Sequence, residues 1–349
     1  MNFSEIIIDW YNINKRDLPW RNTSDPYKIW LSEIILQQTR VEQGKPYYFA
    51  FVENFPTVKD LALAHQDDVL KLWQGLGYYS RARNLHFAAQ QVVNEFDGVF
   101  PDNYKDLLKL KGVGDYTAAA IASFAFDEAK AVVDGNVYRV LSRVFGIASP
   151  IDSSKGKKEF QNIADELIDR NQPAAFNQAI MEFGALQCVP ASPDCENCPL
   201  KIECEAYKKN IISQLPFKEK KIKQKHRYFN YFIITDKNDN IAIQQRGKGD
   251  IWENLFELPL IETSSELNEN FKEIEKLLAE TFKSNSKTSF LFNQKHILTH
   301  RIINAKFFKI EVEKLDNPSL NWKVIPLTEA RKYAFPRLID LAFEKLNLY

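Results

Sequence analysis

The sequence predicts a multidomain protein in which an all-α domain is followed by an α+β domain. The chain has 349 residues, and because a domain holds roughly 150 residues, this length favours two domains. Helical patterns fill the first part, whereas β-rich runs and turn clusters take over from Arg227. We therefore expect a helical domain over 1–205, a linker over 206–226 and an α+β domain over 227–349.

Three segments of the first domain have helical character. Tyr27 to Val41 lacks glycine and proline and follows Pro26, a residue that is common at helix starts. Residues 80–96 carry apolar side chains at a spacing of 3.6 residues, and 116–126 form an alanine-rich apolar run that exceeds the usual strand length. We expect all three segments to be helices, and the alanine-rich one to be buried.

The second domain mixes strand and helix patterns. Residues 227–247 contain two β-rich runs around the turn cluster DKNDN, which predicts a hairpin. Residues 265–282 predict a helix, 303–315 a strand, and 327–346 a helix that is interrupted near Pro336.

The charge balance restricts the partners only weakly. The chain has 46 basic and 46 acidic residues, and a neutral sum is a mild argument against binding nucleic acid. However, Lys208 to Arg227 contains eight basic residues and one acidic residue, Glu219, so a local basic face is compatible with the sequence. The charge run alone favours the plainer alternative, a solvated linker. The N-terminus has no secretory signal, and no apolar run reaches about 20 residues, so we expect a soluble, cytoplasmic protein without a membrane partner.

All four cysteines lie in one short stretch with the spacing C-x6-C-x2-C-x5-C: Cys188, Cys195, Cys198 and Cys204. Two disulfides are disfavoured in a large chain without a secretion signal. Four thiolates suit either a tetrahedral zinc ion or an iron–sulfur cluster. The spacing predicts a metal centre and leaves these two alternatives open.

Two further motifs stand at helix starts. Gly112, Val113 and Gly114 separate two helical segments, and a glycine turn of this kind leaves backbone N–H groups bare for a phosphate oxygen. A plain corner between helices is the alternative. Asp134 precedes an apolar helix, and an isolated aspartate at such a position is typically an N-cap.

Taken together, the glycine turn, the aspartate some twenty residues later and the cysteine loop resemble the helix-hairpin-helix superfamily of base-excision DNA glycosylases. Within it, the blocks LPWR, DPYKIWLSEIILQQTRV, LWQGLGYYSRARNLH, KGVGDYTAAAI, VDGNVYRVLSRV and FNQAIMEFGALQC resemble the A/G-specific adenine glycosylases (MutY type), strongly over 10–205. Residues 227–349 resemble, more weakly, the MutT-like (Nudix-fold) domain of that family. The resemblance implies a [4Fe–4S] cluster on the four cysteines, and a monomer that binds double-stranded DNA with adenine opposite 8-oxoguanine or guanine.

The same resemblance implies two catalytic carboxylates. Glu33 matches the general acid, and Asp134 matches the anion that stabilises or attacks the oxocarbenium-like sugar. Tyr116 and Asn136 match their polar partners. The helical neighbours of Glu33 are mostly apolar, so its carboxyl should resist ionisation; a surface glutamate is the alternative.

The resemblance also suggests the contacts with the substrate. The hairpin residues Gly112, Val113 and Gly114 would bind a DNA phosphate. The other residues would bind the adenine, the duplex or the opposite base: Arg21, Gln38, Leu76, Tyr78, Glu182, Leu298, Thr299 and His300. Leu298, Thr299 and His300 align with the loop that reads the opposite base in this family. Leu298 replaces an aromatic residue of that loop and Thr299 replaces a serine. Leu298 cannot stack on a base as an aromatic ring does.

Two features concern the type of reaction. The endonuclease III branch has a lysine at the position of Tyr116, and this lysine forms a Schiff base, so Tyr116 indicates a monofunctional hydrolase. The second domain lacks the Arg-Glu-x2-Glu-Glu run of MutT-type hydrolases, so we expect no nucleotide hydrolysis there. The alternatives are an endonuclease III-like glycosylase/lyase that acts on oxidised pyrimidines, and a non-catalytic iron–sulfur DNA-binding protein.

Overall fold

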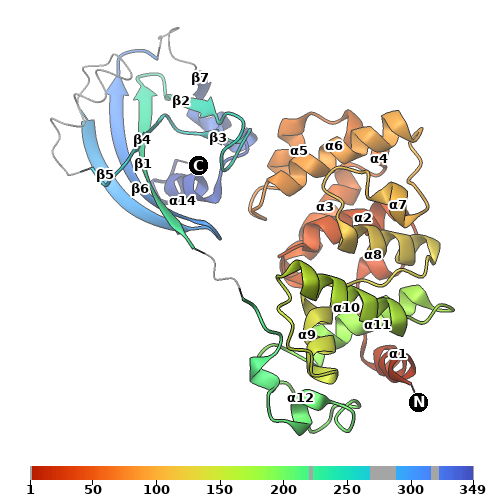
Figure 1. Cartoon of the computed structure of the whole chain (residues 1–349). Coiled ribbons are helices and arrows are strands. Elements are labelled where there is room, and N and C mark those ends of the chain that lie inside the picture. The colour runs from red at the N-terminus through yellow and green to blue at the C-terminus, as the bar shows by residue number, and fades with distance from the viewer. Residues whose placement is uncertain (1, 220–222, 268–287, 316–321, 349) are drawn as a thin grey trace. The chain divides into compact units, whose positions relative to one another are not determined.

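The computed structural model describes residues 2–219, 223–267, 288–315 and 322–348. Most of the helix predicted over 265–282 lies outside the described residues. The chain forms two compact units: Met1–Leu63 with Asn84–Lys221, and Ala64–Arg83 with Ile222–Tyr349. Each unit is described here by itself (Figure 1).

The first unit is helical, as predicted. Its helices are α1 (Phe3–Asn14), α2 (Pro26–Leu36), α3 (Val41–Asn54), α4 (Val58–Leu63), α6 (Ser80–Glu95), α7 (Tyr104–Leu107), α8 (Asp115–Phe126), α9 (Gly135–Val144), α10 (Ser154–Leu167), α11 (Pro173–Leu186) and α12 (Glu205–Lys208). The short 3-10 helices η1 (Pro19–Arg21) and η2 (Ile212–Gln214) complete it. Among the described residues, no helix is long and apolar enough to cross a bilayer.

Side chains define where several of these helices begin. Asn2 and Glu5 form a capping box at α1. Asp25 accepts a hydrogen bond from the Tyr27 N–H at the start of α2, and Pro26 occupies the first helical position. The alanine-rich α8 is buried along most of its length and packs against α2 and α11, which confirms its predicted place in the core.

The predicted helix over Tyr27–Val41 is wrong at its C-terminal end. Helix α2 stops at Leu36, because Gln38 adopts a left-handed conformation with φ of 58°, and a new helix begins at Val41. The break directs Gln38 out of the helical run, and this turn borders the cavity described below.

The second unit is built around a mixed sheet with the strand order β3-β2-β1-β6-β5, while β4 pairs with β1 and β7 with β2. The strands are β1 (Lys225–Asp236), β2 (Asn240–Gln245), β3 (Phe256–Glu257), β4 (Leu260–Thr263), β5 (Thr288–Ile297), β6 (Arg301–Val312) and β7 (Lys323–Pro326). The helical elements are α5 (Gln66–Leu72), η3 (Leu327–Lys332) and α14 (Arg337–Lys345).

Both faces of this sheet are covered with apolar side chains. The antiparallel pairing of β1 and β2, with Thr235 opposite Ile241, confirms the predicted hairpin. The central strands β1 and β6 run parallel. Tyr231 and Phe307 belong to the core that includes α14, and Phe232 packs in a second cluster on the other side. The alternation follows from the two-residue period of a strand.

Candidate active site

The glycine hairpin joins α7 to α8 and requires glycine at only one of its two positions. Gly112 has a φ of 78°, and a Cβ added there would lie 2.7 Å from Asn84 Cβ. Gly114 caps α8 without a side-chain hydrogen bond, and a Cβ added there would meet open space. Val113 is buried. The turn is therefore a tight corner with an uncapped helix start, which suits an anion.

A matched pair of alanine variants tests the hairpin. Gly112→Ala should lower the free energy of unfolding by roughly 1–3 kcal/mol through left-handed strain, with the Asn84 clash in addition, and should weaken DNA binding. Gly114→Ala should cost less, on the order of 0.5–1 kcal/mol, because alanine is only a poorer N-cap there. Thermal unfolding and DNA titration of both variants measure this difference. Equal destabilisation by the two substitutions would contradict the described turn.

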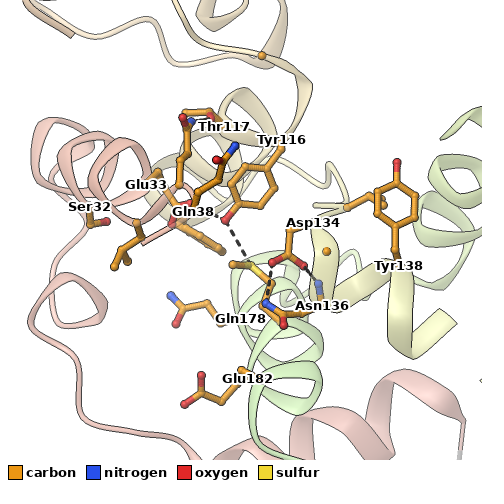
Figure 2. Close-up of a pocket in the computed structure, with 18 of the residues that line it drawn as sticks. Ser32, Glu33, Gln38, Tyr116, Thr117, Asp134, Asn136, Tyr138, Gln178 and Glu182 are labelled. Atoms are coloured by element: carbon orange, nitrogen blue, oxygen red, sulfur yellow. Dashed lines mark hydrogen bonds between the residues drawn. The ribbon is translucent and has the colours of Figure 1, made fainter. Parts of the chain in front are cut away.

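A cavity of about 1470 Å³ opens in the first unit between residues of α2, α8, α9, α10 and α11 (Figure 2). It is larger than the pocket of a typical small molecule. The cavity brings together most of the residues predicted for the reaction in this unit: Arg21, Glu33, Gln38, Gly112, Gly114, Tyr116, Asp134, Asn136 and Glu182. They come from segments that are far apart in the sequence, so the fold assembles them.

Glu33 is a buried carboxyl with a raised pKa. Its side chain projects from α2, is only 7% exposed and accepts a 2.5 Å hydrogen bond on Oε2 from the Tyr116 hydroxyl. Burial raises the pKa of Glu33 to about 7; the nearby Asp134 adds to this rise, and the Tyr116 hydrogen bond partly opposes it. Burial likewise raises the pKa of Tyr116 well above its usual value, so Tyr116 acts here as a neutral donor.

Asp134 is an N-cap and a cavity residue at the same time. Its Oδ1 accepts hydrogen bonds from the N–H groups of Asn136 and Val137, both at 2.8 Å, and its Oδ2 accepts one from Asn136 Nδ2 at 2.8 Å. Burial raises the pKa of Asp134, although these hydrogen bonds favour the ionised form. Asp134 therefore caps α9 as its sequence position predicted, and the capping hydrogen bonds orient its carboxylate in the cavity.

The cap is locked by the neighbouring helix. Asn136 accepts a 2.8 Å hydrogen bond on Oδ1 from Arg139 Nη2, which fixes its amide so that Nδ2 faces Asp134. Gly184 of α11 lies against Asn136, and a Cβ added to Gly184 would lie 2.6 Å from Asn136 Cβ. Only a glycine allows α9 and α11 to approach this closely.

Glu182 forms an ion-pair cluster on another wall of the cavity. Its carboxylate is buried and accepts hydrogen bonds from Nε and Nη2 of Arg16 and from both Nη atoms of Arg21, at 2.7–3.0 Å. Burial alone would raise the pKa of Glu182, but the hydrogen bonds from the two arginines outweigh it and hold the pKa at about 2. The cluster presents an ordered polar wall to a bound ligand.

Sequence reasoning missed two residues of this wall. Arg16 lies in the segment KRDLPWR, five residues before Arg21, and Gln178 lies one helical turn before Glu182. Gln178 accepts a 2.8 Å hydrogen bond from Tyr11. The helical spacing of Gln178 from Glu182 was the signal that could have found it.

Replacing Glu182 with glutamine should destabilise the protein at neutral pH by about 3 kcal/mol, because two cations lose a buried partner. The pKa of Glu182 is lower in the folded state, so its stabilisation is present above about pH 4.5 and is lost as the pH falls towards 2. Unfolding curves of wild type and variant should therefore converge below about pH 4.5. Glu196→Gln, which breaks an exposed ion pair with Lys201, is the control and should change little. A constant difference across this pH range would contradict the cluster.

Other predicted residues belong to the second unit. Leu76 is 7% exposed, whereas Tyr78 is 47% exposed and adopts a φ of 46°. The hydroxyl of Tyr78 is hydrogen-bonded to that of Thr299. Leu298 and His300 flank Thr299 in the turn between β5 and β6, where the Leu298 N–H donates to Arg301 O at 2.8 Å. Of Leu76 and Tyr78, which were both predicted to contact the substrate, Tyr78 is the more exposed.

The four cysteines are unbonded and partly buried: Cys188, Cys195, Cys198 and Cys204. Burial raises the pKa of Cys188, Cys195 and Cys198, and the charge of neighbouring thiols adds to the rise. Arg143 Nη1 approaches Cys188 Sγ at 3.5 Å. In the described part of the chain, no group of three or more His, Cys, Asp or Glu side chains is arranged to hold a metal ion. Four thiols in one loop are nevertheless the donor set that a zinc ion or an iron–sulfur cluster takes.

The fold and the site define a base-excision DNA repair protein with an added Nudix-type domain. Residues 31–169 match the model of the HhH-GPD superfamily of base excision DNA repair proteins, and residues 230–345 match that of the NUDIX domain. Among solved structures, a thermostable thymine-DNA glycosylase is 34% identical with a TM-score of 0.56. This match covers 59% of this chain and 95% of that one.

Similar proteins of known activity identify the family within the base-excision repair proteins. An adenine DNA glycosylase of Buchnera aphidicola subsp. Schizaphis graminum is 36% identical over 317 residues, which cover 88% of this chain and 89% of the relative. The adenine DNA glycosylase of Homo sapiens is 43% identical over 222 residues, 61% of this chain and 41% of the human protein. The chain belongs to the adenine DNA glycosylase family. The predicted resemblance, fold class and enzyme class are thereby confirmed.

Proposed function

We propose that this enzyme hydrolyses the N-glycosidic bond of adenine opposite 8-oxoguanine or guanine in double-stranded DNA, and that it acts as a monomer. The observation that carries the proposal is the pair Glu33 and Asp134, which line one cavity large enough for an extruded nucleotide. A base inside a duplex cannot be reached, so it must leave the stack, at a cost of a few kcal/mol.

The two carboxyls have environments suited to different roles. Glu33, with a pKa of about 7, is protonated in about half of the molecules at neutral pH, and the protonated form donates to the departing adenine. Because Tyr116 occupies Oε2, Oε1 is the oxygen available for this transfer. Asp134 is aligned by backbone and amide donors on both oxygens, and its negative charge stabilises the oxocarbenium-like sugar. The ionised Glu33 then accepts a proton from the attacking water.

Base recognition follows from the polar wall. Glu182, Arg21 and Gln178 line the same cavity as the two carboxyls, and Gln38 borders it from the turn after α2. Fixed amide and carboxylate groups discriminate between bases because a wrong base leaves buried polar atoms unpaired. We infer that these residues contact the adenine.

Tyr116 supports a monofunctional reaction. It occupies the position that holds the Schiff-base lysine in the endonuclease III branch, and its hydroxyl is hydrogen-bonded to Glu33. A phenol at this position has no amine for strand cleavage. We therefore infer that the product is an abasic site.

The remaining parts have supporting roles in the proposal. The domain boundaries stay at 1–205, 206–226 and 227–349, and the last domain reads the base opposite the adenine through Thr299 and His300. Segment 64–83, which bears Tyr78, belongs to the same compact unit as that domain. Cys188, Cys195, Cys198 and Cys204 would hold a [4Fe–4S] cluster, which when bound cross-links the end of the helical domain.

Excision kinetics on duplexes with adenine opposite 8-oxoguanine, G, T and C test the function. We expect the fastest adenine release opposite 8-oxoguanine, and strand breaks only after alkali treatment. Strand scission without alkali would reject the monofunctional mechanism and favour the glycosylase/lyase. Absence of excision from every duplex, with DNA binding retained, would favour the non-catalytic alternative.

A further inference from the structure

Two lysines of α10, Lys157 and Lys158, line the catalytic cavity and are exposed. Within the described ranges, neither forms an ion pair with a carboxylate. Other lysines of the same unit do have acidic partners: Lys28, Lys109, Lys130, Lys201, Lys208 and Lys209. The two cavity lysines therefore keep their charge available for a ligand.

Lys157 and Lys158 do not stabilise helix α10 at this position. The first turn of α10 has no acidic residue, and cations at a helix N-terminus are opposed by the helix dipole. The turn is nevertheless rigid. The Gly156 N–H donates to Ser153 Oγ at 3.0 Å, and a Cβ added to Gly156 would lie 2.0 Å from Pro150 O. The backbone that carries the lysines is thus fixed against the loop before it.

Helix α10 also borders the segment that carries Asp134. Phe160 packs edge-on against Tyr138 of α9, with ring centroids 5.1 Å apart. Gln161 Nε2 donates to Ala131 O at 3.0 Å, three residues before Asp134. Tyr138 and Gln161 line the cavity together with the two lysines. The lysines therefore belong to the part of the wall that adjoins the catalytic aspartate.

We propose that Lys157 and Lys158 bind phosphates of the strand whose adenine is extruded, as a second phosphate contact in addition to the hairpin. This inference rests on the proposed function. Asp134 must stay ionised close to a polyanionic strand, and two cations in the lining of the same cavity attract that strand and help to hold its sugar over the carboxylate.

Salt-dependent binding tests the inference. The probe is a duplex with 8-oxoguanine opposite a 2′-fluorinated adenosine, which resists hydrolysis. Lys157→Ala/Lys158→Ala should reduce the slope of log affinity against log salt by about 2, one for each lost phosphate contact. Lys155→Ala, in the same turn but outside the cavity lining, should leave the slope unchanged. Unfolding temperatures should not fall, because each variant removes a cation from a helix N-terminus.

Phosphate substitution assigns the strand. Methylphosphonates beside the adenosine analogue should weaken binding by the wild type and have little effect on the double variant. An unchanged slope in the double variant, or equal methylphosphonate effects on both proteins, would overturn the inference. Adenine excision by the wild type is measured in parallel. If the wild type excises adenine while the slope is unchanged, only the lysine inference fails; if it excises none, the proposed function fails.

Discussion

Glu33→Gln should reduce the rate of adenine excision by about 10²–10⁴-fold, the usual contribution of a general acid, and should also make the folded protein more stable at alkaline pH. Glutamine fits the same space and can accept the Tyr116 hydrogen bond, so the loss is one of proton transfer. In the wild type, the rate should fall as the pH rises through about 7, where Glu33 ionises. Single-turnover kinetics across this pH range measure both effects.

The stability effect has a definite sign. The pKa of Glu33 rises from 4.5 to about 7 on folding, so the wild type loses stability as the pH rises through this window. Glutamine cannot ionise, so the variant should gain up to about 3 kcal/mol relative to the wild type above about pH 7, and almost nothing below about pH 4.5. Glu42→Gln, on the exposed rim of the same cavity, is the control and should change neither rate nor stability. A near-normal rate of adenine excision by Glu33→Gln would exclude Glu33 as the general acid.

Asp134→Asn should slow excision by about 10³-fold or more, because the developing positive charge on the sugar loses its fixed anion. The fold should survive, since asparagine is as good an N-cap as aspartate. Affinity for DNA should be unchanged or higher, because a negative charge near the phosphates is removed. Single-turnover excision, DNA titration and thermal unfolding of the variant separate these three outcomes.

Asp25→Asn provides the matched control for this variant. Asp25 caps α2 through the Tyr27 N–H, does not line the cavity, and should tolerate the same exchange without loss of rate. In the wild type, burial raises the pKa of Asp134, so the acid limb of the rate profile should lie above the usual range of an aspartate. A rate within tenfold of the wild type for Asp134→Asn would exclude the electrostatic role.

The sequence predicted the long periodic elements well. Apolar spacing located α6 and α8, and the turn cluster located the β1–β2 hairpin, because these patterns depend on local geometry. The predicted end of α2 was wrong because Gln38 adopts a left-handed conformation. A glutamine in the sequence does not predict this conformation.

The site was predictable only in part from local sequence. The apolar neighbours of Glu33 gave the direction of its pKa shift, but its proximity to Asp134 came from the resemblance. The salt bridge of Arg16 with Glu182 joins residues 166 positions apart, and no local pattern encodes such a pairing. The grouping of 64–83 with the second unit depends on tertiary contacts for the same reason.

The contact of Gly184 with Asn136 has a consequence for catalysis. Helix α11 carries both Gly184 and Glu182, which we propose contacts the base, while Asn136 aligns the carboxylate of Asp134, which we propose faces the sugar. Because not even a methyl group fits between α9 and α11 at this point, Glu182 and Asp134 cannot move independently of each other. The site is therefore already assembled before a nucleotide binds. Its polar groups need little rearrangement during bond cleavage, which lowers the reorganisation energy of the reaction.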